Sequence, residues 1–181
     1  AKKYHEQCTK IVMRELEKAN FYAQIHEVFL ERNVAGTGCI LTMEGKKNTL
    51  NFTALDWGSY VIGEDDERNV TYLGRKIRLN AANAVKKVGR ENLPPKVLEN
   101  LDNEAKMNEK FVFIHEVSER DDSERDANRM DGVNKPWSSK YVCENPKWFI
   151  KEGGFEEQPY GCSRFNRWPG FIYGWGPGLE S

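Results

Sequence analysis

The chain has 181 residues, and its 27 Lys and Arg nearly balance its 28 Asp and Glu, for a formal net charge of −1. A chain of this length buries roughly 70% of its unfolded surface, so it needs no disulfide or metal to fold. The balanced charge argues against nucleic acid as a partner, because nucleic-acid-binding proteins carry a basic surplus. We also expect no signal peptide and no transmembrane segment, since no apolar stretch approaches the ~20 residues that span a bilayer.

The chain is expected to open with one helix and a β-hairpin. Apolar residues at helical spacing predict a helix over about residues 5–19, with charged residues mostly on its other face. Residues 21–30 fit either a second helix or a strand, because a helical apolar stripe coincides with strand-forming residues. Two β-forming runs, 39–43 and 49–53, flank the turn sequence 45–48 and predict a hairpin.

A second hairpin and a helix are expected next. Residues 59–62 and 70–73 have strand-forming patterns on either side of the acidic loop 64–67. Asn80 is of a residue type that caps helices, and it directly precedes the apolar pattern of residues 81–88. Gly89 then provides a stop signal, so the pattern predicts a short helix between the two.

The predicted domain ends with one more helix and its last strand. Pro94 and Pro95 suit the start of a helix, and residues 111–117 read as a strand. Residues 1–117 are therefore predicted to form a compact α+β domain with an N-terminal helix, a small antiparallel sheet built from hairpins, and two further helices. We expect a long irregular C-terminal extension, rich in aromatic residues, Gly and Pro, to complete the chain.

Residues 118–132 are predicted to be a charged linker. Nine of the residues from 118 to 131 are charged, six of them acidic and three basic. A solvated linker or an exposed helix explains such a run, and a docking surface for basic partners is the alternative.

Residues 133–181 have a different composition, and we expect an extended arm. They hold 11 of the 21 aromatic residues and five of the seven Pro. Gly and Pro at this density prevent a regular helix and break long strands. The rings must then be buried against the protein's own domain, another protein or a membrane–water interface. The predicted partner-binding residues are Trp137, Tyr141, Trp148, Phe149, Arg167, Trp168, Phe171, Tyr173 and Trp175.

Cysteine and histidine patterns give no catalytic or metal site. Cys143 and Cys162 lie in the same extension and are candidates for a disulfide, with reduced thiols as the alternative. Without a C-x-x-C pair or a neighbouring histidine we expect no zinc, no other metal and no cofactor. His115 shares a strand face with Phe111 and Phe113, which favours a buried or half-buried structural histidine over a catalytic one.

Two further motifs fail as ligand-binding loops. The glycine-rich stretch 174–178 contains Pro177, which lacks the N–H that a phosphate loop needs. Residues 126–132 bear only a faint likeness to a calcium loop, because Met130 stands where an oxygen ligand belongs and Asp131 where the turn glycine belongs.

These observations favour a non-catalytic, structural accessory subunit whose partners are other proteins of a large complex. The setting we hypothesise is the soluble face of an organellar membrane complex of photosynthetic or respiratory electron transport, in the thylakoid or mitochondrion. The C-terminal aromatics would add contact with the membrane interface. One alternative is a ligand-binding or enzymatic α+β domain with an apolar pocket near His26, His115 and Cys39. Another is a secreted domain glycosylated at Asn51 and Asn69.

Overall fold

The computed structural model of the chain describes residues 2–45, 47–121, 123, 125–126 and 128–179. The predicted linker at 118–132 therefore lies partly outside the described residues, at positions 122, 124 and 127. The chain forms two compact units. Unit 1 consists of Ala1–Gly58 and Pro159–Ser181, and unit 2 of Ser59–Gln158.

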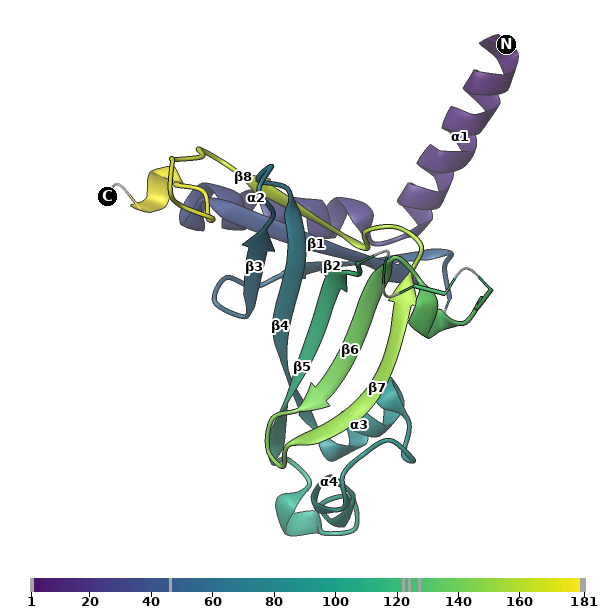
Figure 1. Ribbon diagram of the computed structural model, residues 1–181, viewed down its shortest axis with the longest axis vertical. Coiled ribbons are helices and arrows are strands. Elements are labelled where there is room, and N and C mark those ends of the chain that lie inside the picture. Colours follow the sequence, from purple (N-terminus) through teal and green to yellow (C-terminus); the bar gives the residue numbers. More distant parts are fainter. Residues whose placement is uncertain (1, 46, 122, 124, 127, 180–181) are drawn as a thin grey trace. The chain divides into compact units, whose positions relative to one another are not determined.

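Unit 1 combines two helices with a three-stranded antiparallel sheet (Figure 1). Helix α1 (Lys2–Lys18) has no buried residue. Helix α2 (Phe21–Ala35) packs on the sheet and buries Val28 and Ala35, so the ambiguous residues 21–30 are helical. The central strand β1 (Thr37–Glu44) pairs with β2 (Leu50–Leu55) and with β8 (Tyr160–Arg164).

Both ends of α2 are joined to neighbouring strands by hydrogen bonds or a tight turn. At its start, the Asn20 side chain donates to the carbonyl of Phe52 at 2.7 Å and accepts from the Phe52 N–H at 2.9 Å. At its end, Gly36 has a φ of 80°, and its N–H donates to the Arg32 carbonyl. Glycine adopts this left-handed conformation without strain, and β1 begins one residue later.

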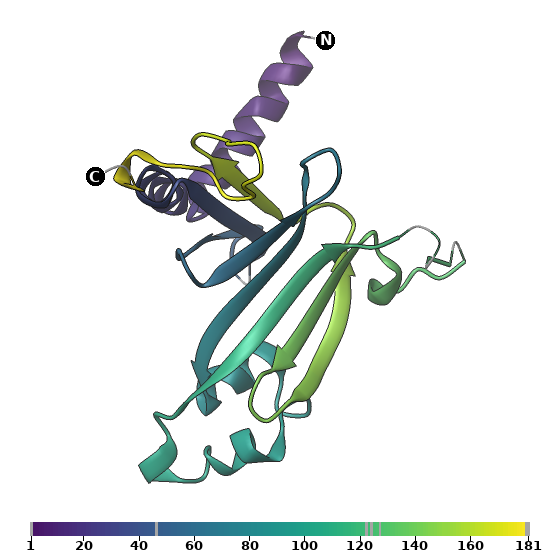
Figure 2. The same cartoon turned by 60° about the vertical axis from the view of Figure 1, so that its left-hand side comes forward.

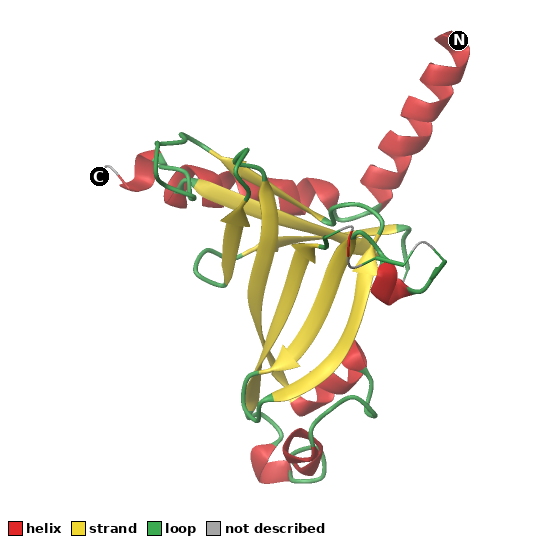
Figure 3. Ribbon diagram, viewed as in Figure 1, coloured by secondary structure: helices red, strands yellow, loops and turns green. Residues whose placement is uncertain are grey.

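Unit 2 is built on a five-stranded antiparallel sheet that twists along its length (Figure 2). The strands follow one another in chain order across the sheet: β3 (Tyr60–Glu64), β4 (Val70–Asn80), β5 (Lys110–Glu119), β6 (Trp137–Cys143) and β7 (Trp148–Phe155). Helices α3 (Ala81–Val88) and α4 (Pro95–Glu99) lie at one end of this sheet (Figure 3). Their apolar residues form a core with Phe111, Phe113 and Ile150.

Short helical turns and caps complete the two units. The Asn80 side chain accepts the N–H of Asn83 at 3.0 Å, so the predicted N-cap of α3 is confirmed. Three 3-10 turns occur in the described residues: η1 (Glu104–Lys106), η3 (Gly132–Asn134) and η4 (Pro177–Leu179).

The predicted fold class is wrong in one respect above all: the described residues form no long irregular extension. The described residues form eight strands in two antiparallel sheets and four α-helices, a mostly β structure, and residues 133–181 supply strands β6, β7 and β8. The irregular arm was predicted because Pro interrupts the hydrogen-bond ladder of a strand. Pro136, Pro146 and Pro159 in fact lie just outside strands, where the missing N–H removes no ladder hydrogen bond.

Candidate protein-docking surface

The C-terminal segment 165–179 packs against the corner between α2 and β1 through backbone atoms. The Gly174 N–H donates to the buried hydroxyl of Thr37 at 2.8 Å. A Cβ atom on Gly174 would lie 2.2 Å from the Gly36 carbonyl oxygen, and one on Gly176 would lie 2.6 Å from the Gly36 nitrogen. Only glycine allows backbones to approach so closely. The glycine-rich motif therefore serves the packing of unit 1.

Further hydrogen bonds fold this segment into a fixed loop. Asn166 and Trp175 form an isolated antiparallel bridge, with backbone N–H to carbonyl distances of 3.3 and 2.8 Å. The Arg164 guanidinium donates to the Ile172 carbonyl at 3.0 Å. These hydrogen bonds, together with the bond from Gly174 to Thr37, fix the backbone that carries the aromatic side chains.

Three rings of this loop, those of Trp168, Phe171 and Trp175, are exposed, whereas Tyr173 is half-buried. Trp168 and Trp175 lie with ring centroids 6.3 Å apart. Tyr173 meets the ring of Trp57 edge-on, at 5.5 Å between centroids. Trp168 and Phe171 nevertheless keep 56% and 60% of their surface exposed. Large rings on a fixed backbone are typical anchors of protein–protein interfaces.

Helix α2 adds a second group of exposed apolar side chains. Leu30 and Val34 are 52% and 63% exposed. The Arg32 guanidinium lies 5.6 Å from the ring centroid of Phe29 and 5.7 Å from that of Phe165, so it joins α2 to the C-terminal segment. We call this set the apolar surface of unit 1: Phe29, Leu30, Val34, Phe165, Trp168, Phe171, Ile172, Trp175 and Leu179.

The structure divides the nine predicted partner-binding residues between the two units. Arg167, Trp168, Phe171, Tyr173 and Trp175 lie together in unit 1, and Trp137, Tyr141, Trp148 and Phe149 lie in unit 2. Trp148 and Phe149 are exposed on β7, whereas Tyr141 is buried in the sheet. The contribution of α2 was missed. Its signal was present, because apolar residues occur on all sides of residues 21–35 rather than on one face.

The disulfide of the structure joins Cys162 to Cys39, which are directly opposite each other on β8 and β1. Cys143, the partner suggested by the sequence, is a free cysteine in the sheet of unit 2, where burial raises the pKa of its thiol. The predicted pair, Cys143 and Cys162, lies within one segment of the chain. Strand pairing instead brings together residues 123 positions apart.

The predicted burial of His115 is confirmed, because its side chain is fully buried in the sheet of unit 2. Arg75 donates to its Nδ1 at 3.1 Å, and its Nε2 lies 3.0 Å from the Ser139 hydroxyl. Burial, with the nearby positive charges of Arg75, Lys87 and Lys151, lowers the pKa of His115 to about 3. His115 is therefore neutral at physiological pH.

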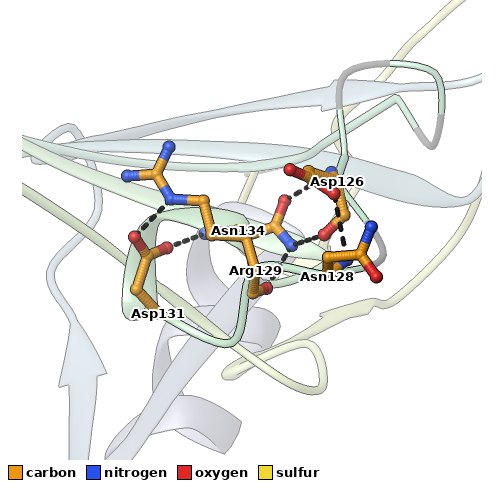
Figure 4. Close-up of polar contacts among 5 residues, drawn as sticks. All are labelled: Asp126, Asn128, Arg129, Asp131 and Asn134. Carbon is orange, nitrogen blue, oxygen red and sulfur yellow. Dashed lines mark hydrogen bonds and ion pairs between the residues drawn. The ribbon is translucent and has the colours of Figure 1, made fainter.

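The charged segment of unit 2 contains a loop closed by its own side chains (Figure 4). The Asn134 amide donates to the carbonyls of Asp126 and Arg129 and accepts the Asp126 N–H. Arg129 pairs with Asp131 at 2.5 Å and lowers the pKa of that carboxyl. These groups line a cavity of about 440 Å³. Within the described part of the chain, no cluster of three or more His, Cys, Asp or Glu residues could hold a metal.

Comparison with known proteins identifies the family of the chain. The family described as bacteriophage head to tail connecting protein matches the chain over residues 1–181. The chain belongs to this family. It is 25% identical over 175 residues to the probable portal protein of Bordetella phage BPP-1, an alignment that covers 96% of the chain and 31% of that protein. It is 24% identical over 145 residues to the portal protein of Salmonella phage epsilon15, covering 78% of the chain and 25% of that protein.

Membership of the head-to-tail connecting family corrects the predicted setting. An organellar electron-transport complex in the thylakoid or mitochondrion is wrong, because the family and both relatives belong to bacteriophages. The predicted peripheral location at an organellar membrane is wrong for the same reason.

No described helix is both long and apolar enough to cross a membrane. Exposed aromatic rings are common at protein–protein interfaces, but they carry no information about which assembly contains the chain.

Two coarser predictions agree with the family. The expectation that the chain has no enzymatic role is confirmed, since connector and portal proteins are structural. The general expectation of protein partners agrees with a family whose description is a protein that connects phage head to tail. The chain spans 31% and 25% of the lengths of the two portal proteins that it matches.

Proposed function

We propose that this chain is a structural part of the connection between phage head and tail, and that it binds neighbouring phage structural proteins through the apolar surface of unit 1. The observation that carries the proposal is the exposure of large apolar side chains on a backbone held by hydrogen bonds. Trp168 and Phe171 are more than half exposed on a loop that the Thr37–Gly174 bond attaches to the sheet.

Energetics favour coverage of this surface by a partner. Complete burial of a large apolar side chain stabilises a complex by ~1.5–3 kcal/mol, and roughly half of that remains available for a half-exposed ring. Because the loop is already ordered, little conformational entropy is lost when it binds. Arg32, held between Phe29 and Phe165, adds a residue type that often anchors interfaces.

The test is assembly of phage particles that carry a Trp168→Ser and Phe171→Ser variant. Both side chains are exposed, so the variant is expected to fold with unchanged thermal stability. Loss of the two anchors is expected to reduce incorporation of the protein into particles at least tenfold, measured by sedimentation and immunoblotting. Normal incorporation of the folded variant would contradict the proposal.

A matched control removes two exposed apolar side chains from unit 2. Val61 and Met130 are 54% and 98% exposed, and we expect Val61→Ser with Met130→Ser to leave incorporation unchanged. An equal defect in this control would show that the assay responds to any loss of surface hydrophobicity, and would also count against a specific role for unit 1.

A further inference from the structure

A row of polar and charged side chains crosses one face of the unit 2 sheet. Arg75 on β4 lies opposite His115 on β5, which lies opposite Tyr141 on β6, which lies opposite Lys151 on β7. Directly opposed residues of antiparallel strands project from the same face of a sheet. The His115 and Tyr141 rings stack with centroids 4.1 Å apart, and the Lys151 Nζ atom lies 5.3 Å from the Tyr141 ring centroid.

The buried guanidinium of Arg75 has neutral partners. Its Nε–H donates to His115 Nδ1 at 3.1 Å, and it also hydrogen-bonds with Tyr141. Because Nδ1 accepts, the proton of the neutral imidazole sits on Nε2 and is donated to the Ser139 hydroxyl. Arg75 is only 7% exposed, and burial lowers the pKa of its side chain. A buried cation without a counter-ion is costly.

Helix α3 brings a third cation to this face. The apolar side of α3 packs into the same core as Tyr141, and Lys87 lies in the last turn of the helix. Burial lowers the pKa of Lys87, and the positive charges of Arg75 and Lys151 lower it further. Lys151 reaches the ring of Tyr141, which stacks on the His115 ring that Arg75 contacts, so a chain of direct contacts connects these two cations. Lys87 and Lys151 are exposed to solvent.

Two carboxylates of these strands, Glu116 and Glu152, belong to another row, on the opposite face. Glu119 shares the face of His115 but lies four residues further along β5, opposite Trp137. Glu116 lies opposite Lys140, and Lys140 lies opposite Glu152, one position along from the row of Arg75. Neighbouring residues of a strand point to opposite faces of the sheet. Glu152 also pairs with Arg120 at 3.0 Å. In the part of the chain that the structure describes, no carboxylate forms a salt bridge with Arg75, Lys87 or Lys151.

We propose that Arg75, Lys87 and Lys151 form a binding site for a carboxylate that is supplied by an acidic segment of a partner protein. The proposal relies on the proposed function only in taking the partner to be a protein. A carboxylate fits because the guanidinium is a planar fork that binds two oxygens, and the two lysines supply mobile donors at the surface. Its negative charge would relieve the repulsion among the three cations and provide the missing counter-ion.

The test measures binding of a short acidic peptide, acetyl-Glu-Glu-Glu-amide, to the protein by calorimetry at low salt. The expected result is saturable binding that a peptide of three glutamines does not reproduce. Lys87→Gln with Lys151→Gln is expected to weaken binding about tenfold, since each exposed ion pair contributes modestly. Arg75 is left unchanged because its substitution would disturb the buried hydrogen bonds.

Lys86→Gln with Lys96→Gln is the matched control, because it removes the same charge from exposed positions of α3 and α4. Equal weakening in this control, or no binding of the acidic peptide, would overturn the proposal. Inorganic phosphate that binds more tightly than the peptide would overturn the choice of a carboxylate. The Trp168→Ser and Phe171→Ser variant is expected to bind the peptide normally, so failure of the docking surface in unit 1 can be told apart from failure of this site.

Discussion

Gly174 donates its backbone N–H to the buried hydroxyl of Thr37, a hydrogen bond of 2.8 Å between residues 137 positions apart. Thr37 is the first residue of β1, and Gly174 lies in the loop that carries Trp168 and Trp175. The bond therefore connects the central strand of unit 1 to the rings of the proposed docking surface. It makes the position of those rings a property of the folded unit rather than of a flexible tail.

Gly174→Ala is expected to destabilise unit 1 by about 2 kcal/mol or more, because the added methyl group would meet the Gly36 carbonyl oxygen at 2.2 Å. Urea denaturation gives the change in the free energy of unfolding, and limited proteolysis reports whether the C-terminal loop is released. Gly161→Ala is the control, since its Cβ would meet only Ile40, at an ordinary 3.7 Å. Similar effects of the two substitutions would contradict the close-packing argument.

Cys162→Ala is expected to lower the free energy of unfolding by roughly 2–4 kcal/mol under oxidising conditions, because the Cys39–Cys162 bond closes a long loop of the unfolded chain. With a reducing agent present, wild type and variant should differ much less. Denaturation with and without dithiothreitol measures both differences. Cys8→Ala, which removes a free thiol, should have no effect that depends on the reducing agent.

His115 is expected to make the stability of the protein depend on pH between about 3 and 6.5. Its folded pKa of about 3 lies below the usual 6.5, so between these values the unfolded chain binds the proton more strongly than the folded one. The contribution to stability is therefore complete above pH 6.5 and is lost as the pH falls. From pH 6.5 to pH 5 the loss is expected to be roughly 1–2 kcal/mol.

The measurement is urea denaturation of wild type, His115→Gln and His26→Gln across this pH range. His115→Gln should flatten the dependence on pH whatever its effect on absolute stability, because glutamine does not titrate. His26→Gln, at an exposed position, controls for the loss of a histidine as such. A His115→Gln protein with the wild-type slope would show that other groups account for the loss of stability in acid.

Features that depend on neighbouring residues were predictable from the sequence. The cap of α3 at Asn80, its stop at Gly89 and the hairpin of β1 with β2 all follow from residue types within a few positions of one another. The burial of His115 followed in the same way from the alternation of apolar residues along β5.

The arm at residues 133–181 was mispredicted because composition says little about pairing partners. Trp137–Cys143 becomes a strand since β5 and β7 lie on either side of it, although the flanking Pro and Gly suggested irregular backbone. Tyr160–Arg164 becomes a strand because β1 accepts it, more than 110 residues away along the chain. Such contacts are selected by the packing of the whole unit, and no local window contains both partners.

The sequence by itself determined the local elements, the abundance of aromatic residues near the C-terminus and the absence of a recognisable catalytic motif. Only the tertiary structure decided that Cys162 pairs with Cys39, that α2 contacts the C-terminal loop through Arg32, and that Arg75 and Lys151 belong to one row across a sheet. The physical reason is the distance along the chain between the residues that interact. Caps and periodicity depend on bonds within one or two turns of the chain, whereas strand pairing and side-chain clusters depend on which distant segments bury their apolar faces together.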